Sequence, residues 1–132
     1  MTGSFLIVDD DVVVTTTFER MLRLEGYEVR TASDAEKGLR EARKSAPRAI
    51  ILDLQMPIVN GLGFLRELRQ HDALRDTPVA IVTGDYFLDE ETERELRALG
   101  AEIRFKPLWL DDLVDLAKHL TADSAQPPKR PM

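Results

Sequence analysis

The 132-residue sequence contains no cysteine, which excludes disulfides, zinc–thiolate sites and cysteine nucleophiles and fits a reducing compartment. No apolar run approaches the ~20 residues of a membrane-spanning helix, and the N-terminus lacks the basic and apolar regions of a signal peptide. Acidic residues outnumber basic ones by 24 to 18, and the net charge of -6 disfavours nucleic-acid binding. These absences predict a cytoplasmic protein that binds neither membrane nor nucleic acid.

Short apolar runs alternate with amphipathic helical patterns along the chain. The runs are rich in β-branched residues and predict strands at residues 5–8, 27–31, 49–52, 79–82 and 102–105. The spacing of Ser33 and Glu36 predicts a capping box at the start of the second helix. Five helices are predicted, and the fourth lies near residues 88–99. The first, second, third and fifth helices each have apolar residues that are expected to face inward. In that order, these are Val14, Phe18, Met21 and Leu22; Ala35, Leu39 and Ala42; Leu62, Leu65 and Leu68; and Leu110, Leu113, Val114, Ala117 and Leu120.

Five strands alternating with five helices predict an α/β fold with a parallel sheet covered on both faces. Right-handed crossovers make such a sheet doubly wound, and its ligands bind beyond the carboxyl ends of the strands. We expect one domain over residues 1–121, a length that suits a single core. Residues 122–132 are polar and rich in proline, and we expect them to form a disordered tail.

Polar or charged groups follow four of the five predicted strands. The first strand runs into three consecutive aspartates and the third into a single one, so that the strand ends carry Asp9, Asp10 and Asp11; Asp53; Thr83 and Gly84; and Lys106 and Pro107. If the first and third strands are neighbours, their carboxylates meet in one crevice. Burying unpaired carboxylates is costly, and a hard divalent cation would neutralise the cluster.

The groups at this edge suit phosphoryl chemistry. Lys106 supplies a positive charge and Thr83 a hydroxyl donor for phosphoryl oxygens. Asp53 stands alone at the end of the buried run AIILD and is the best candidate for a nucleophile that forms an aspartyl phosphate. Gly84 is expected to leave space for the incoming group. Asp11 is expected to cap the first helix, where a carboxylate favours the exposed amides.

Four segments together resemble the response-regulator receiver domain of bacterial two-component systems. They are IVDDD at 7–11, LDLQMPIVNG at 52–61, VTG at 82–84 and FKP at 105–107, and the resemblance extends from Phe5 to about Leu120. It implies a flavodoxin-like sheet with strand order 2-1-3-4-5. It also implies that Asp53 accepts the phosphoryl group, that Thr83 and Lys106 contact it, and that the Lys106–Pro107 peptide bond is cis.

The resemblance further implies a Mg²⁺ site. Its ligands would be Asp10 directly, Asp9 mainly through water, Asp53, and the backbone carbonyl of Gln55. Gln55 and Asp85 each lie two residues beyond a site residue, and we expect them to tune the lifetime of the phosphoryl group.

The implied function is a signalling switch that a histidine kinase or phosphotransfer protein phosphorylates. We expect it to phosphorylate and dephosphorylate itself without being a turnover enzyme, and to signal through a changed protein-interaction surface. No output segment follows within this sequence, so a separate downstream protein is the expected partner, although a piece of a longer regulator stays open. A homodimer through the fourth helix, fifth strand and fifth helix is a further implied arrangement.

The residue three positions before Lys106 leaves an alternative function open. The family often has an aromatic residue three positions before the lysine, where this chain has Ile103, so the usual coupling between that aromatic residue and Thr83 is in question. A phosphorylation-independent interaction module is therefore the first alternative. A Mg²⁺-dependent phosphohydrolase is less favoured because Gln55 cannot transfer protons. A flavin-binding protein is also less favoured, because the loop after the first strand is acidic where a phosphate-binding loop would be rich in glycine, serine or threonine. Trp109 is expected to pack against the core, and contact with a partner protein from the fifth helix is the less favoured interpretation.

Overall fold

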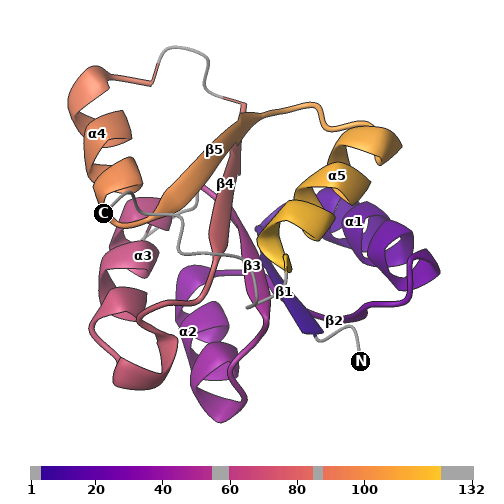
Figure 1. Ribbon diagram of the computed structural model, residues 1–132, viewed down its shortest axis with the longest axis horizontal. Helices are drawn as coiled ribbons and strands as arrows, with labels where there is room; N and C mark the ends of the chain where they lie inside the picture. Colours follow the sequence, from indigo (N-terminus) through magenta and orange to yellow (C-terminus); the bar gives the residue numbers. More distant parts are fainter. Residues whose placement is uncertain (1–3, 55–59, 85–87, 123–132) are drawn as a thin grey trace.

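The computed structural model describes residues 4–54, 60–84 and 88–122. Within these residues five parallel strands form one sheet in the order β2-β1-β3-β4-β5 (Figure 1). The strands are β1 (Ser4–Val8), β2 (Glu28–Ala32), β3 (Ala49–Asp53), β4 (Val79–Thr83) and β5 (Ala101–Phe105). The helices are α1 (Val12–Leu24), α2 (Ala35–Lys44), α3 (Gly61–Arg69), α4 (Glu90–Ala98) and α5 (Leu110–Leu120), with a short 3-10 helix η1 (Asp72–Leu74). The predicted fold class and strand order are confirmed.

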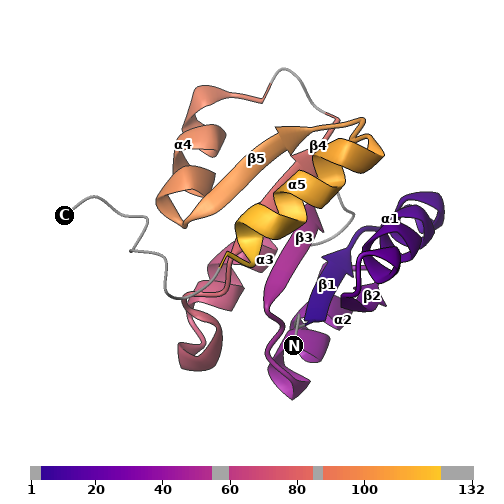
Figure 2. The same ribbon diagram turned by 45° about the vertical axis from the view of Figure 1, so that its right-hand side comes forward.

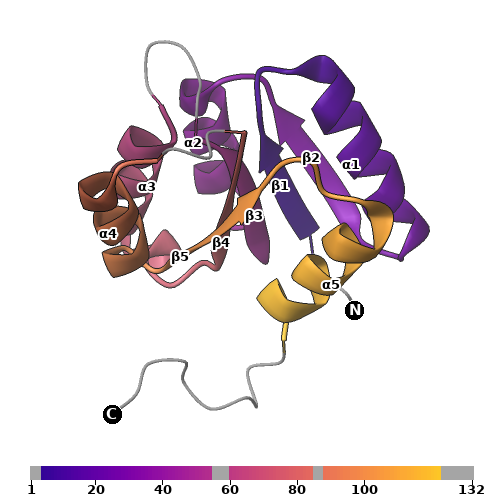
Figure 3. The ribbon, with the colours of Figure 1, turned by 90° about the horizontal axis from the view of Figure 1, so that it is seen from above.

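The helices cover both faces of the sheet. Helices α1 and α5 lie on one face and α2, α3 and α4 on the other, as the views in Figures 2 and 3 show. Side chains alternate along each strand, so Phe5 and Ile7 pack on the α1–α5 side while Leu6 and Val8 pack on the opposite side. This two-sided burial explains why the three central strands, β1, β3 and β4, are nearly continuous apolar runs. The edge strands β2 and β5 are less buried and contain charged residues.

Most of the expected inward-facing residues are buried, and those that are only half-buried are Val14, Met21, Leu62 and Val114. Leu110, the first residue of α5, is 48% exposed, whereas Leu116, which was not among the expected residues, is buried. Trp109 is 69% exposed, so the expectation that it packs against the core is wrong. Phe64 of α3, which the helical pattern did not include, is fully buried.

Aspartate caps fix the starts of α1, α2 and α4, the last through Asp89, whose Oδ1 accepts the Thr92 amide at 3.0 Å. The carboxylate of Asp11 accepts hydrogen bonds from the amides of Val13 and Val14, as expected. The cap of α2 is Asp34, whose Oδ1 accepts the Lys37 amide at 2.8 Å, and not Ser33 as the capping-box spacing suggested. A carboxylate is the stronger acceptor beside the positive end of a helix, which explains the shift by one residue.

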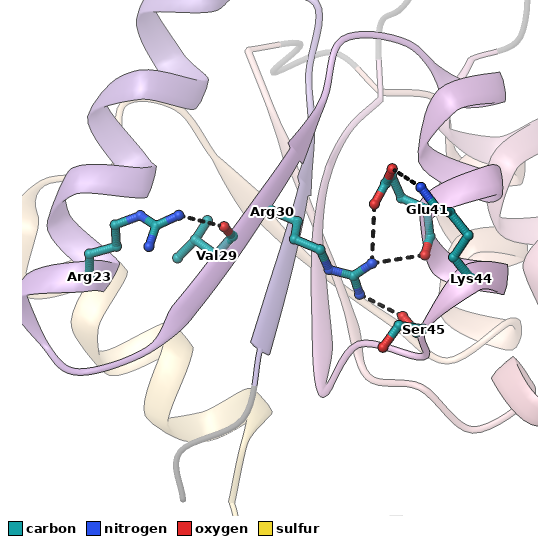
Figure 4. A network of polar contacts seen from close by, with 6 residues as sticks. All are labelled: Arg23, Val29, Arg30, Glu41, Lys44 and Ser45. Atoms are coloured by element: carbon teal, nitrogen blue, oxygen red, sulfur yellow. Dashed lines mark hydrogen bonds and ion pairs between the residues drawn. The ribbon is translucent and has the colours of Figure 1, made fainter.

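Arginines tie the edge strand β2 to the helices on both faces (Figure 4). Arg30 donates to the carbonyls of Glu41 and Ser45 and to the Glu41 carboxylate, and Arg23 of α1 donates to the Val29 carbonyl at 2.8 Å. Hydrogen bonding and charge from Lys44 lower the pKa of Glu41, and Arg30 adds to this effect. These contacts hold an edge strand that has only β1 as a strand neighbour.

Arg69 at the end of α3 binds three backbone carbonyls. It donates to Leu74 at 3.2 Å, to Thr77 at 2.7 Å and to Leu99 at 2.8 Å. Burial lowers the pKa of Arg69, and the charge of Asp76 opposes this effect. One half-buried guanidinium therefore joins α3 to the segment before β4 and to the end of α4.

No helix among the described residues is long and apolar enough to cross a membrane. The expected tail at 122–132 lies outside the described part of the chain except for its first residue, so its disorder stays a prediction.

Replacing Arg69 with methionine should lower the free energy of unfolding by about 2 kcal/mol, because three carbonyls would lose a charged donor. Urea unfolding followed by circular dichroism measures the change. Arg97→Met is the matched control, because it removes only the exposed pair with Glu93 in α4 and should cost about 0.5 kcal/mol or less. Equal losses for the two variants would contradict this role of Arg69.

Candidate functional site

Three carboxylates converge at the carboxyl ends of β1 and β3. These strands are neighbours, with Val8 opposite Leu52, so Asp9 and Asp10 emerge beside Asp53. One oxygen from each of the three side chains lies within 4.8 Å of the others. Asp9 and Asp53 are only 4% and 6% exposed, whereas Asp10 is exposed. The expected crevice of carboxylates is therefore present.

The three consecutive aspartates take three different environments. Asp9 donates its amide to the Ala32 carbonyl of β2, and its Oδ1 accepts the Asp11 amide at 2.9 Å. Asp11 turns its own carboxylate to the start of α1 and lies outside the cluster. Asp9 and Asp10 thus belong to the carboxylate cluster, and Asp11 caps α1.

Lys106 reaches the cluster from the end of β5. Its Nζ lies 3.3 Å from Asp9 Oδ2 and 3.7 Å from Asp53 Oδ1. Its amide donates to the Thr83 carbonyl at 2.8 Å, which fixes the strand end from which the side chain extends. The Lys106–Pro107 peptide bond is cis, as expected.

Carboxylates outnumber ammonium groups in the cluster that the described residues form. The cluster of Asp9, Asp10 and Asp53 has three carboxylates, and Lys106 supplies one positive charge beside it. Negative charge held at a largely buried site favours cation binding. Oxygen-only ligands are the set that hard divalent cations such as Mg²⁺ prefer, so the residues present fit such an ion.

Thr83 and Gly84 complete this edge at the end of β4. Thr83 is fully buried, and β4 lies between β3, which carries Asp53, and β5, which leads to Lys106. A Cβ built at Gly84 would meet no atom of the described residues within 4 Å. The role of Gly84 in access stays a prediction. Gln55 and Asp85 lie outside the described residues, so their expected roles stay predictions as well.

The position expected to couple to Thr83 is occupied by a buried aliphatic residue. Ile103 is 8% exposed, lies opposite Ile81, and packs on the α2–α3–α4 side of the sheet. The residue opposite Thr83 is Phe105, which is 40% exposed. The aromatic side chain nearest in register to Thr83 is therefore two positions later than the family pattern suggests.

Sequence reasoning missed one contact at the site. Gly61, the first residue of α3, lies against the backbone of Asp53 and Leu54 and donates its amide to the Leu54 carbonyl at 2.9 Å. The only available signal was the glycine itself, placed eight residues after the acidic strand end in the motif LDLQMPIVNG.

The sequence model of the response regulator receiver domain matches residues 5–118 of this chain. The chain belongs to the response regulator receiver family. It is a two-component receiver domain, and the acidic cluster at its strand ends fits that family.

Relatives of known sequence include transcriptional regulators and a single-domain protein. The transcriptional regulatory protein PrrA of Mycobacterium tuberculosis is 38% identical over 115 residues, which cover 87% of this chain and 48% of PrrA. The polar-differentiation response regulator DivK of Brucella ovis is 32% identical over 94% of this chain and 100% of DivK. The receiver thus spans about half the length of PrrA but the whole of DivK.

Solved receivers share the fold. The chemotaxis protein CheY4 of Vibrio cholerae superimposes with a TM-score of 0.82 at 28% identity, over 89% of this chain and 98% of CheY4. A response regulator from Chloroflexus aurantiacus superimposes with a TM-score of 0.82 at 32% identity, over 92% of this chain and 98% of that protein.

Proposed function

We propose that this receiver accepts a phosphoryl group on Asp53 from a histidine kinase or a phosphotransfer protein in the cytoplasm. The observation that carries the proposal is the meeting of Asp9, Asp10 and Asp53 with Lys106 at one edge of the sheet. Family membership supplies the class of donor, and the geometry supports the choice of acceptor.

Transfer begins when an Asp53 carboxylate oxygen attacks the phosphorus atom of a phosphohistidine. The new O–P bond forms as the P–N bond breaks, and the electron pair of that bond goes to the imidazole nitrogen, which then takes a proton. Lys106 pairs with a phosphoryl oxygen, and the Thr83 hydroxyl donates to another. The short distance from Lys106 Nζ to Asp53 supports this assignment.

Asp9, Asp10, Asp53 and the backbone carbonyl of Gln55 would hold Mg²⁺ in this proposal. The ion would neutralise charge on the phosphoryl oxygens and bring an anionic group close to an acidic cluster. The oxygen-only donor set and the excess of negative charge support Mg²⁺ as the cofactor.

Incubation with acetyl phosphate and Mg²⁺ should add one phosphoryl group, measured by intact mass spectrometry. Asp53→Asn removes the nucleophile and should abolish the gain, and omission of Mg²⁺ should reduce it strongly. A phosphorylated histidine phosphotransfer domain as donor tests the proposed partner class. Phosphoryl uptake by Asp53→Asn at the wild-type rate would contradict the assignment.

We propose that Gln55 and Asp85, which follow Asp53 and Thr83 by two residues, flank the path of an attacking water and so set the lifetime of the aspartyl phosphate. Gln55→Ala and Asp85→Ala should each slow hydrolysis, since alanine cannot orient water by hydrogen bonding. Loss of the phosphoryl mass with time, after removal of the donor, measures the rate. Unchanged rates in both variants would contradict the proposal.

Signalling is proposed to pass from Thr83 to a surface formed by α4, β5 and α5. Ile103 of β5 lies in the core beneath this surface. Exposed apolar residues follow at the end of β5 and the start of α5, namely Phe105, Trp109 and Leu110. Exposed large apolar side chains that lie close together in the sequence support an interaction site here. We propose that this surface binds a downstream protein and supports a homodimer of the phosphorylated chain.

Beryllofluoride with Mg²⁺, which mimics the aspartyl phosphate, should convert the chain to a dimer in sedimentation velocity experiments. Trp109→Ser should stay monomeric because it removes the most exposed aromatic side chain among the described residues. Thr83→Ala should stay monomeric because it removes the proposed coupling hydroxyl. Fluorine NMR confirms that both variants still bind beryllofluoride. A wild-type monomer at saturating beryllofluoride would rule out the homodimer.

A further inference from the structure

Gly61 packs closely against the backbone of the proposed phosphoacceptor. A Cβ built at this position would lie 2.8 Å from the Asp53 carbonyl oxygen, 2.8 Å from the Leu54 Cα and 3.4 Å from the Asp53 carbonyl carbon. The first two distances are far shorter than an ordinary contact, and both neighbours are main-chain atoms. An added methyl group therefore cannot be accommodated by rotation of a flexible side chain.

The constraint at Gly61 is one of space. Its φ lies outside the left-handed range that favours glycine, so alanine can adopt the same backbone conformation. The positive φ values among the described glycines belong to Gly26 and Gly100, neither of which is at the site. Substitution by alanine at position 61 thus tests the close approach alone.

Gly61 is also hydrogen-bonded to Leu54, the residue that follows β3. Its amide donates to the Leu54 carbonyl at 2.9 Å, and the neighbouring Asn60 caps α3 by accepting the Gly63 amide at 3.0 Å. Gln55, the proposed source of a carbonyl ligand, is the residue directly after Leu54. The start of α3 is therefore fixed against the residue that carries the acceptor carboxylate and the residue before the carbonyl ligand.

We infer that Gly61 is a positioning residue for the metal and phosphoryl site, acting through the backbone of Asp53 and Leu54. This inference rests on the proposed function and deepens it. A side chain at position 61 would displace that backbone by several tenths of an ångström. The displacement would move the Asp53 carboxylate relative to Asp9 and Lys106, on which both cation binding and transfer depend.

Gly38 offers a matched control elsewhere in the fold. A Cβ there would lie 2.8 Å from Val8 Cγ2 and 2.9 Å from Phe64 Cε2, so the overlap is as severe as at Gly61. The atoms contacted are side-chain ends in the core between α2, β1 and α3. Gly38→Ala should therefore lower the unfolding midpoint without displacing the backbone of Asp53.

The experiment compares wild type, Gly61→Ala and Gly38→Ala at a temperature where circular dichroism shows all three folded. Calorimetric titration gives the Mg²⁺ dissociation constant, and intact mass gives the rate of phosphoryl uptake from acetyl phosphate. Gly61→Ala should weaken Mg²⁺ binding and slow uptake by about ten-fold each, since small misplacements cost this much. Gly38→Ala should stay close to wild type in both values.

A Gly61→Ala chain equal to wild type in both values would overturn the inference alone. A wild-type chain that binds Mg²⁺ but takes up no phosphoryl group would instead contradict the proposed function. Should Gly61→Ala fail to fold, amide NMR of the wild type provides the test. The Gly61 resonance should shift with the midpoint of Mg²⁺ binding while that of Gly38 does not, and an unshifted Gly61 would overturn the inference.

Discussion

Electrostatic repulsion among carboxylates at the end of the sheet is the constraint on which this site depends. Asp9 and Asp53 are held almost entirely away from water, and Asp10 lies beside them. The ammonium group of Lys106 lies beside Asp9 and Asp53 and offsets part of their charge. The Asp11 amide, which donates to Asp9, adds to this compensation, and the concentration of negative charge favours the binding of a cation.

The parallel sheet brings these charged residues together at one edge. Because every strand runs in the same direction, the residues that end β1, β3, β4 and β5 meet at one edge. The central strands β1, β3 and β4 are apolar and buried on both faces, so the packed core holds their ends in position. Backbone hydrogen bonds of Asp9 and Lys106 add to this support.

The positions of strands and site residues could be predicted because they follow from local rules. AIILD is a buried strand that ends in a charge, and the alternation of such strands with helical patterns predicts a doubly wound parallel sheet. The strand order within that sheet followed from the resemblance to receiver domains. Features that depend on distances between separate segments could not be predicted. The exposure of Trp109, the cap at Asp34 and the contact of Gly61 with Asp53 each depend on where a neighbouring element comes to lie.

Helix α4 is held less firmly than its neighbours. Of its nine residues only Leu96 is buried, whereas α2, α3 and α5 each bury four. Its polar anchors, the Arg66–Glu95 pair and the bond from Arg69 to Leu99, all lie in its second half or just beyond it. Hydrophobic free energy scales with buried area. The first turns of α4, which are nearest in sequence to Thr83, are therefore the part of the layer formed by α2, α3 and α4 that can be displaced at the lowest cost in free energy.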